Sequence, residues 1–109
     1  MATKRLRPVH PGDILRHDFM EPLQLTAYRV AKDLSVSAPT VNEIVRRRKS
    51  ITAEMALRLA RYFGTSAQLW LNLQTQYDLE VANQKSGKRI EKAIQPAALA
   101  NPAPADKAA

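Results

Sequence analysis

The stretch AYRVAKDLSVSAPTVNEIVR, from Ala27 to Arg46, constrains the fold of this chain more than any other feature. Thr26 and Ser37 are good N-cap residues, and each precedes a run in which apolar side chains recur three and four residues apart. Such a recurrence is typical of a helix with one buried face. The stretch therefore predicts two short helices joined by a tight turn, the helix-turn-helix whose second helix enters the DNA major groove.

The turn between the two predicted helices is consistent with this interpretation. Ala31 is small where the helices must approach closely, and Val36 anchors the turn. Ser35 stands where this motif usually has glycine, and a serine in the left-handed backbone conformation costs some free energy. The residues expected to pack the angle between the helices are Val30, Leu34, Val41 and Ile44. An ordinary helical hairpin would share this spacing, so that alternative stays open.

Three further helices are predicted, which makes the fold class all-α, a five-helix domain. Pro11 suits the first turn of a helix that Pro22 ends, because proline disfavours helical geometry in the residue before it. Thr52 caps a fourth helix, and Gly64 suits the left-handed residue at its end. Ser66 begins the fifth helix.

The last predicted helix carries more apolar side chains than one buried face needs, so we expect part of it to contact a second copy of the chain. The residues expected at this dimer interface are Leu69, Trp70, Leu73 and Tyr77. Beyond Gln84 the composition changes to lysine, alanine and proline. The expected organisation is a flexible basic arm over 1–9, a helical domain over 10–84 and a mostly disordered tail over 85–109, in which a short ordered patch at 90–94 stays open.

Composition narrows the classes of function that fit the chain. The 109 residues include 17 Lys and Arg against 10 Asp and Glu, a net charge of +7, which favours a polyanion such as nucleic acid or anionic lipid as partner. Between Thr26 and Arg61 eight bases face three acids. The chain has no cysteine, no secretion signal and no apolar run long enough for a bilayer. We therefore expect a cytoplasmic protein without a membrane partner.

No group of residues predicts catalysis or metal binding. His10, Asp13 and His17 can share one side of the first helix, but two histidines and one carboxylate lack a fourth ligand. His17 with Asp18 or Glu21 has no nucleophile or phosphate-binding loop to accompany it. We expect no enzymatic activity, no metal site and no cofactor.

The residues expected to contact DNA lie on and just after the second helix of the motif. Those of its first turn should lie nearest the bases, namely Ser37, Ala38, Pro39 and Thr40. One turn later, Asn42 suits adenine and Glu43 suits cytosine, while Ala38 or the Thr40 methyl suits thymine. The basic run that follows should reach phosphates and consists of Arg46, Arg47, Arg48 and Lys49. A solvated helix face and loop would have the same composition, so that interpretation also stays open.

With these residues identified, the chain resembles the HigA family of antitoxins, also called VapI-like, within the lambda-repressor-like helix-turn-helix group. The resemblance rests on HPGDIL at 10–15, EPLQLTAYRVAKDLSVS at 21–37, ITAEMALRLARYFGTS at 51–66 and LWLNLQTQYDLEVA at 69–82. It implies a five-helix homodimer that represses its own operon and neutralises a HigB-like toxin, a RelE-like ribonuclease. The family usually has glycine where this chain has Arg47, and it shows no pattern matching the tail.

Two functional hypotheses follow from this resemblance. In the first, the chain is an antitoxin and repressor whose dimer places two recognition helices about 34 Å apart, so its operator should be palindromic double-stranded DNA. In the second, it is a stand-alone helix-turn-helix regulator with no toxin partner. A short basic reading frame beside its gene would favour the first.

Overall fold

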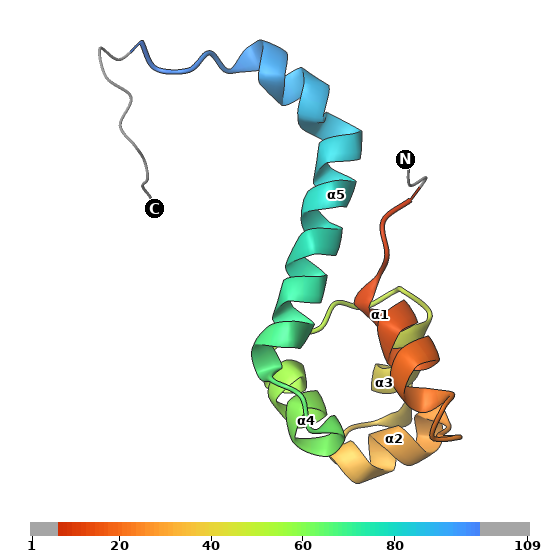
Figure 1. The fold of residues 1–109 in the computed structure, drawn as a ribbon. Helices are drawn as coiled ribbons and strands as arrows, with labels where there is room; N and C mark the ends of the chain where they lie inside the picture. Colours follow the sequence, from red (N-terminus) through yellow and green to blue (C-terminus); the bar gives the residue numbers. More distant parts are fainter. Residues whose placement is uncertain (1–6, 99–109) are drawn as a thin grey trace.

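The structure, a computed structural model, describes residues 7–98, and every regular element within that range is a helix. The helices are α1 (Pro11–Ile14), η1 (Leu15–Met20), α2 (Ala27–Leu34), α3 (Ala38–Val45), α4 (Ala53–Phe63) and α5 (Ala67–Ala93). Because α1 runs directly into η1, the two form one helix, and the predicted five-helix, all-α fold is confirmed. Figure 1 shows α1 to α4 gathered at one end of the molecule and α5 extending away from them. In the described range no helix is both long and apolar enough to cross a membrane.

Four of the predicted helix starts are capped as the sequence suggested. The hydroxyl of each cap residue accepts a hydrogen bond from the backbone N–H three residues later, which satisfies a donor that has no partner inside the helix. The cap residues and distances are Thr26 at 3.1 Å, Ser37 at 3.4 Å, Thr52 at 3.1 Å and Ser66 at 3.0 Å.

The first helix widens in a way that the sequence did not indicate. From Leu15 to Met20 it is a π-helix, and the N–H of Glu21 donates to the carbonyl of Arg16 at 2.9 Å. In a π-helix residues five apart stack on one face, because the hydrogen bonds span five residues. Leu15 and Met20, which are five apart, are both buried in the core. The wider turn therefore lets both side chains face the other helices.

The core lies where α1 to α4 meet the first turns of α5. Its largest member is Trp70, which is fully buried and whose indole Nε1 donates to the Thr65 hydroxyl at 2.8 Å. The rings of Phe19 and Phe63 lie 5.1 Å and 6.5 Å from that of Trp70. The four residues predicted to pack the angle between α2 and α3 are buried, namely Val30, Leu34, Val41 and Ile44. The periodicity thus identified the buried faces of these two helices correctly.

Ser35 ends α2 in the left-handed conformation that the turn requires, with φ 62° and ψ 43°. The expected backbone cost at this serine is therefore present, and its side chain is exposed. Gly64 ends α4 in the same region with φ 75°, also as predicted.

Replacing Ser35 with glycine is expected to raise the free energy of unfolding by about 0.5–1 kcal/mol, because glycine adopts positive φ without a Cβ penalty. Urea unfolding followed by circular dichroism measures the change. The matched control is Ser37→Ala in the same turn, which removes an N-cap and should lower the same quantity by about 1 kcal/mol. A Ser35→Gly protein less stable than the parent would contradict the expectation.

The helical domain extends further than predicted at its C-terminal side. α5 continues to Ala93, so the expectation of a mostly disordered 85–109 is wrong for residues 85–93. Adding residues to an existing helix avoids the cost of nucleation, and the penalty of about 1 kcal/mol for Gly87 does not interrupt it. Residues 94–98 have no regular structure, and the arm over 1–6 and the tail over 99–109 lie outside the described residues.

Candidate nucleic-acid interface

The helix α3 is attached to the domain by one side only. Val41 and Ile44 on that side are fully or almost fully buried, whereas Ser37 and Pro39 are exposed and Asn42 is half-buried. The polar side of α3 therefore faces outward. The helices of an ordinary hairpin also expose their polar sides, so this exposure leaves one side of α3 accessible to a partner without distinguishing the two interpretations.

The first two turns of α3 present several hydrogen-bonding groups. The hydroxyls of Ser37 and Thr40 share a hydrogen bond of 2.8 Å, which orients both at the helix start. The Asn42 amide donates a long bond of 3.4 Å to the carbonyl of Ala38, which leaves its side-chain oxygen as an acceptor. The Glu43 carboxylate lies 3.8 Å from the Arg48 guanidinium. Glu43 is thus partly neutralised by the basic run that it precedes.

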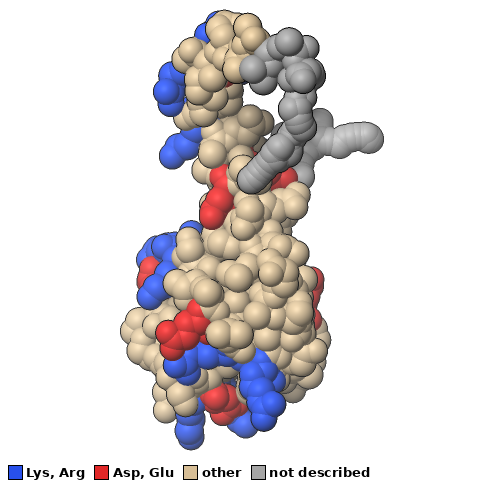
Figure 2. All heavy atoms as spheres, turned by 90° about the vertical axis from the view of Figure 1, so that its left-hand side faces the viewer, with Lys and Arg blue, Asp and Glu red and all other residues tan. Residues whose placement is uncertain are grey.

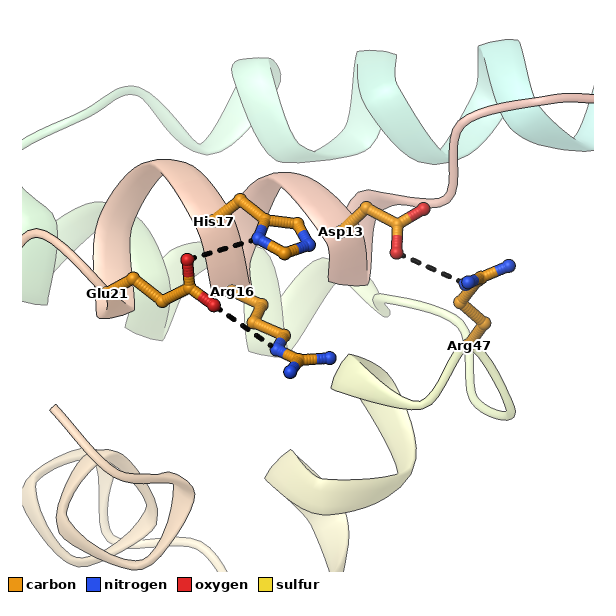
Figure 3. Close-up of polar contacts among 5 residues, drawn as sticks. All are labelled: Asp13, Arg16, His17, Glu21 and Arg47. Atoms are coloured by element: carbon orange, nitrogen blue, oxygen red, sulfur yellow. Dashed lines mark hydrogen bonds and ion pairs between the residues drawn. The ribbon is translucent and has the colours of Figure 1, made fainter.

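The basic run after α3 divides into two kinds of residue that the sequence could not distinguish. Arg47 Nε lies 3.1 Å from Asp13 Oδ1 (Figure 3). Arg48 pairs with Glu43. Arg46 and Lys49 have no ion-pair partner among residues 7–98. All four side chains are exposed. Exposed ion pairs are worth little in water, so the paired arginines can exchange a carboxylate for a phosphate at small cost.

Arg47 adopts the left-handed conformation with φ 63°, two residues after the end of α3 at Val45. Only glycine adopts this conformation without a Cβ penalty, so an arginine here costs some backbone free energy. The loop therefore keeps its left-handed turn in this chain. The extra guanidinium extends from that turn to α1.

The start of α1 is built around His10, which is buried. Its Nδ1 accepts a hydrogen bond of 2.9 Å from the N–H of Gly12, and its ring lies edge-on to Tyr77 with centroids 4.7 Å apart. Burial lowers the pKa of the His10 imidazole below its ordinary value. The backbone N–H of His10 donates in turn to Asp13 at 3.4 Å. His10 therefore caps α1, and Asp13 links this cap to Arg47.

The other residues considered for a metal site contact charged side chains. His17 Nδ1 lies 3.2 Å from Glu21, whose second oxygen lies 3.5 Å from Arg16 (Figure 3). Within residues 7–98 no cluster of three or more side chains has the chemistry to hold a metal ion.

The residues predicted for a dimer interface fall into different environments. Trp70 is fully buried in the core of one chain, so its assignment to the interface is wrong, because no part of its surface is free for a partner. Leu69 is 36% exposed, while Leu73 is half-buried and Tyr77 packs against His10. Apolar side chains further along are more accessible, namely Leu79 and Ile90 on α5 and Ile94 just after its end. Periodicity placed Trp70 on an apolar stripe but did not show which side of α5 the core covers.

Positive charge is not confined to the motif. Figure 2 shows Lys and Arg on the compact part of the molecule and again at the far end of α5. The bases of that far end are exposed, and they are Lys85, Lys88, Arg89 and Lys92. Charge alone therefore does not locate the interface. At α3 the bases adjoin the second helix of a helix-turn-helix, and the polar side of that helix faces outward.

Comparison with protein-family models matches a helix-turn-helix family over residues 18–70. The virulence-associated protein I of Dichelobacter nodosus is 55% identical over 76 residues, which cover 70% of both chains. The antitoxin HigA-1 of Vibrio cholerae is 36% identical over 77 residues, with 71% of each chain covered.

Two solved structures are similar over nearly their whole length. The Pseudomonas aeruginosa antitoxin HigA with the higBA promoter has a TM-score of 0.82 and 52% identity, covering 84% of this chain and 99% of its own. The antitoxin GraA in complex with its operator has a TM-score of 0.81 and 40% identity, covering 91% of this chain and 100% of its own.

Proposed function

This chain belongs to the helix-turn-helix proteins, in the group that includes HigA antitoxins and virulence-associated protein I, and on that basis we propose that it is a sequence-specific DNA-binding repressor. The family is one of DNA-binding proteins and not of enzymes. The observation that carries the proposal is the outward polar side of α3, followed directly by a run of exposed bases. Similar chains solved with promoter or operator DNA support it.

The first turn of α3 supplies the proposed base contacts. Ser37, Ala38, Pro39 and Thr40 lie nearest the bases, and Asn42 and Glu43 follow one turn later. The 3.4 Å bond of the Asn42 amide to a backbone carbonyl is long enough to be exchanged for a bond to adenine. Glu43 accepts from cytosine only when it leaves Arg48, so its contribution to specificity should be the smaller of the two.

The basic run supplies the proposed phosphate contacts. Arg46 and Lys49 make them first, since neither has an ion-pair partner among residues 7–98. Arg47 and Arg48 add to them by exchanging Asp13 and Glu43 for phosphate oxygens. Such contacts position the protein on the duplex and carry no sequence information by themselves.

We propose further that the protein acts as a cytoplasmic homodimer on a palindromic operator of its own promoter, and that it neutralises a HigB-like toxin of the RelE-like ribonuclease class. Several similar proteins are named as antitoxins, and these names support this more specific function. A stand-alone regulator is the alternative, since the Escherichia coli protein YbaQ, described as an uncharacterized HTH-type transcriptional regulator, is 42% identical over 84 residues. Copurification with the product of the adjacent gene separates the two: a stable complex favours the antitoxin, and no complex favours the alternative.

The DNA-binding role is tested by gel shifts on the upstream DNA and on a scrambled duplex. Asn42→Ala is expected to weaken binding to the upstream DNA about tenfold to a hundredfold and to change binding to the scrambled duplex little, because it removes a base contact. Lys49→Gln should weaken binding to both, and it should reduce the slope of log K against log salt by about one per subunit.

The matched control is Lys88→Gln at the far end of α5, where an exposed lysine lies outside the proposed interface. Its affinity and salt slope should equal those of the parent. Equal losses on both duplexes for Asn42→Ala would refute the base contact, and a Lys88 variant as weak as the Lys49 variant would refute the location of the interface.

A further inference from the structure

Gln74, on α5, is buried and hydrogen-bonded at both ends of its amide. Its side chain is 6% exposed, and its Oε1 accepts a bond of 2.7 Å from the backbone N–H of Ile51. Its Nε2 donates to Asp78 Oδ1 at 2.9 Å. We propose that Gln74 is a positioning residue that holds the basic segment 46–50 in place for phosphate contact, a role that rests on the DNA-binding function proposed above.

The chemistry of an amide suits this place. Ile51 is 3% exposed and precedes α4, so its backbone N–H is buried where no helical partner is available. A buried N–H without an acceptor costs about 1–3 kcal/mol. The Gln74 side-chain oxygen supplies the acceptor, and the Gln74 NH2 group donates to the Asp78 carboxylate. The bond to Asp78 keeps the Gln74 oxygen oriented toward the loop. An apolar residue of the same size would fill the space and leave the loop unattached.

The segment 46–50 is thereby attached to the domain on both sides. On one side the backbone N–H groups of Arg47 and Arg48 donate to the carbonyls of Ile44 and Glu43 in α3, at 3.0 Å and 2.8 Å. On the other side Ile51 is bound to Gln74. Among the described residues His10 and Gln74 are the two buried polar side chains, and Gln74 bonds to Ile51, which directly follows the segment.

Lys49 lies between the two attachments and two residues before Ile51. With the loop fixed during folding, little backbone entropy remains to be lost when a phosphate binds. Without the bond to Gln74 the loop would have to be ordered again at each binding event, and Lys49 would make its phosphate contact for only part of the bound state. α5, which makes no proposed contact with DNA, would in this way set the affinity of the phosphate-binding segment.

The test is Gln74→Met, which keeps the size of the side chain and removes its acceptor. The backbone N–H of Ile51 should exchange with deuterium at least tenfold faster than in the parent. Affinity should fall about tenfold on the upstream and the scrambled duplex alike, which corresponds to about 1.4 kcal/mol, and the salt slope should become shallower. Asp78→Ala, at an exposed position, should change the exchange rate of Ile51, the DNA affinity and the salt slope in the same directions by smaller amounts. This variant tests the proposal if Gln74→Met folds poorly.

Two controls separate positioning from stability. Gln68→Met replaces another glutamine of α5, one that is exposed and bonded to Asn72, and should leave DNA binding unchanged. Phe63→Leu lowers stability away from the loop and should leave the salt slope unchanged at temperatures where the protein is folded. A loss of affinity with an unchanged slope in both Gln74→Met and Phe63→Leu would reduce Gln74 to a structural residue and overturn the proposal.

The outcomes also separate this inference from the function on which it rests. If Lys49→Gln weakens binding and Gln74→Met does not, the segment binds phosphate without help from Gln74, and the positioning role is refuted. If the parent protein binds no duplex, or if Lys49→Gln has no effect, the DNA-binding role of the segment fails and the inference fails with it. Faster exchange at Ile51 with unchanged DNA affinity would likewise overturn it.

Discussion

Replacing Gly12 with alanine is expected to lower the free energy of unfolding by about 3 kcal/mol, near the upper end for an overpacked site. A Cβ placed on Gly12 would lie 1.9 Å from the carbonyl oxygen of Ile44 and 2.8 Å from its carbonyl carbon. Both atoms are backbone, so the contact can be relieved only by moving α1 away from the last turn of α3. The core between these helices would open, and the segment after α3 would move with them.

Urea unfolding followed by circular dichroism measures the loss, and Gly87→Ala is the matched control. A Cβ on Gly87 would lie 2.2 Å from Asn83 Oδ1, the movable end of an exposed side chain. Once Asn83 changes rotamer, alanine should favour the helix by up to about 1 kcal/mol. A Gly12→Ala protein as stable as the parent would show that α1 and α3 are not held as closely as the structure places them.

The second large effect is expected for Trp70→Ala, which should lower the free energy of unfolding by about 3–5 kcal/mol. Trp70 is fully buried, and the rings of Phe19 and Phe63 surround it. Its removal leaves a cavity and also leaves the Thr65 hydroxyl without its indole partner. The milder Trp70→Phe should lose less, because it keeps a ring in the same space.

Circular dichroism at several protein concentrations distinguishes a core role from an interface role. If Trp70 supports the core of one chain, its removal lowers stability by a similar amount at every concentration. Leu69→Ala is the control, since Leu69 is an exposed neighbour on the same helix and should change stability little. A Trp70→Ala protein that keeps its secondary structure and only dissociates into monomers would restore the interface assignment.

Much of the local structure was predictable because it depends on residues close together in the chain. The caps at Thr26 and Ser37, the left-handed Ser35 and the buried faces of α2 and α3 all follow from contacts within a few residues. The exposed side of α3 followed from the same periodicity. Its individual contacts with bases stay predictions.

The end of α5 and the π-helical turn show where local reasoning was insufficient. The lysine-rich run around Gly87 gives no strong signal for or against a helix, and its conformation depends on the stable helix that precedes it. The wide turn from Leu15 to Met20 places both of these side chains in the core. The spacing of apolar residues in the sequence does not indicate such a turn. The W-L-N-L-Q pattern did contain a signal for Gln74, because a polar residue within an apolar stripe indicates a buried partner.

Sequence alone determined the class of the fold, the position of the helix-turn-helix and the sign of the charge beside it, since helix periodicity, capping and composition depend on neighbouring residues. Only the tertiary structure decided which bases are free, which apolar side of α5 is covered and why Gly12 must lack a side chain. These properties depend on groups that are distant in the chain and meet in space, such as Asp13 with Arg47 and Ile51 with Gln74. The pairing of such groups is set by how the helices pack, which no short stretch of sequence encodes.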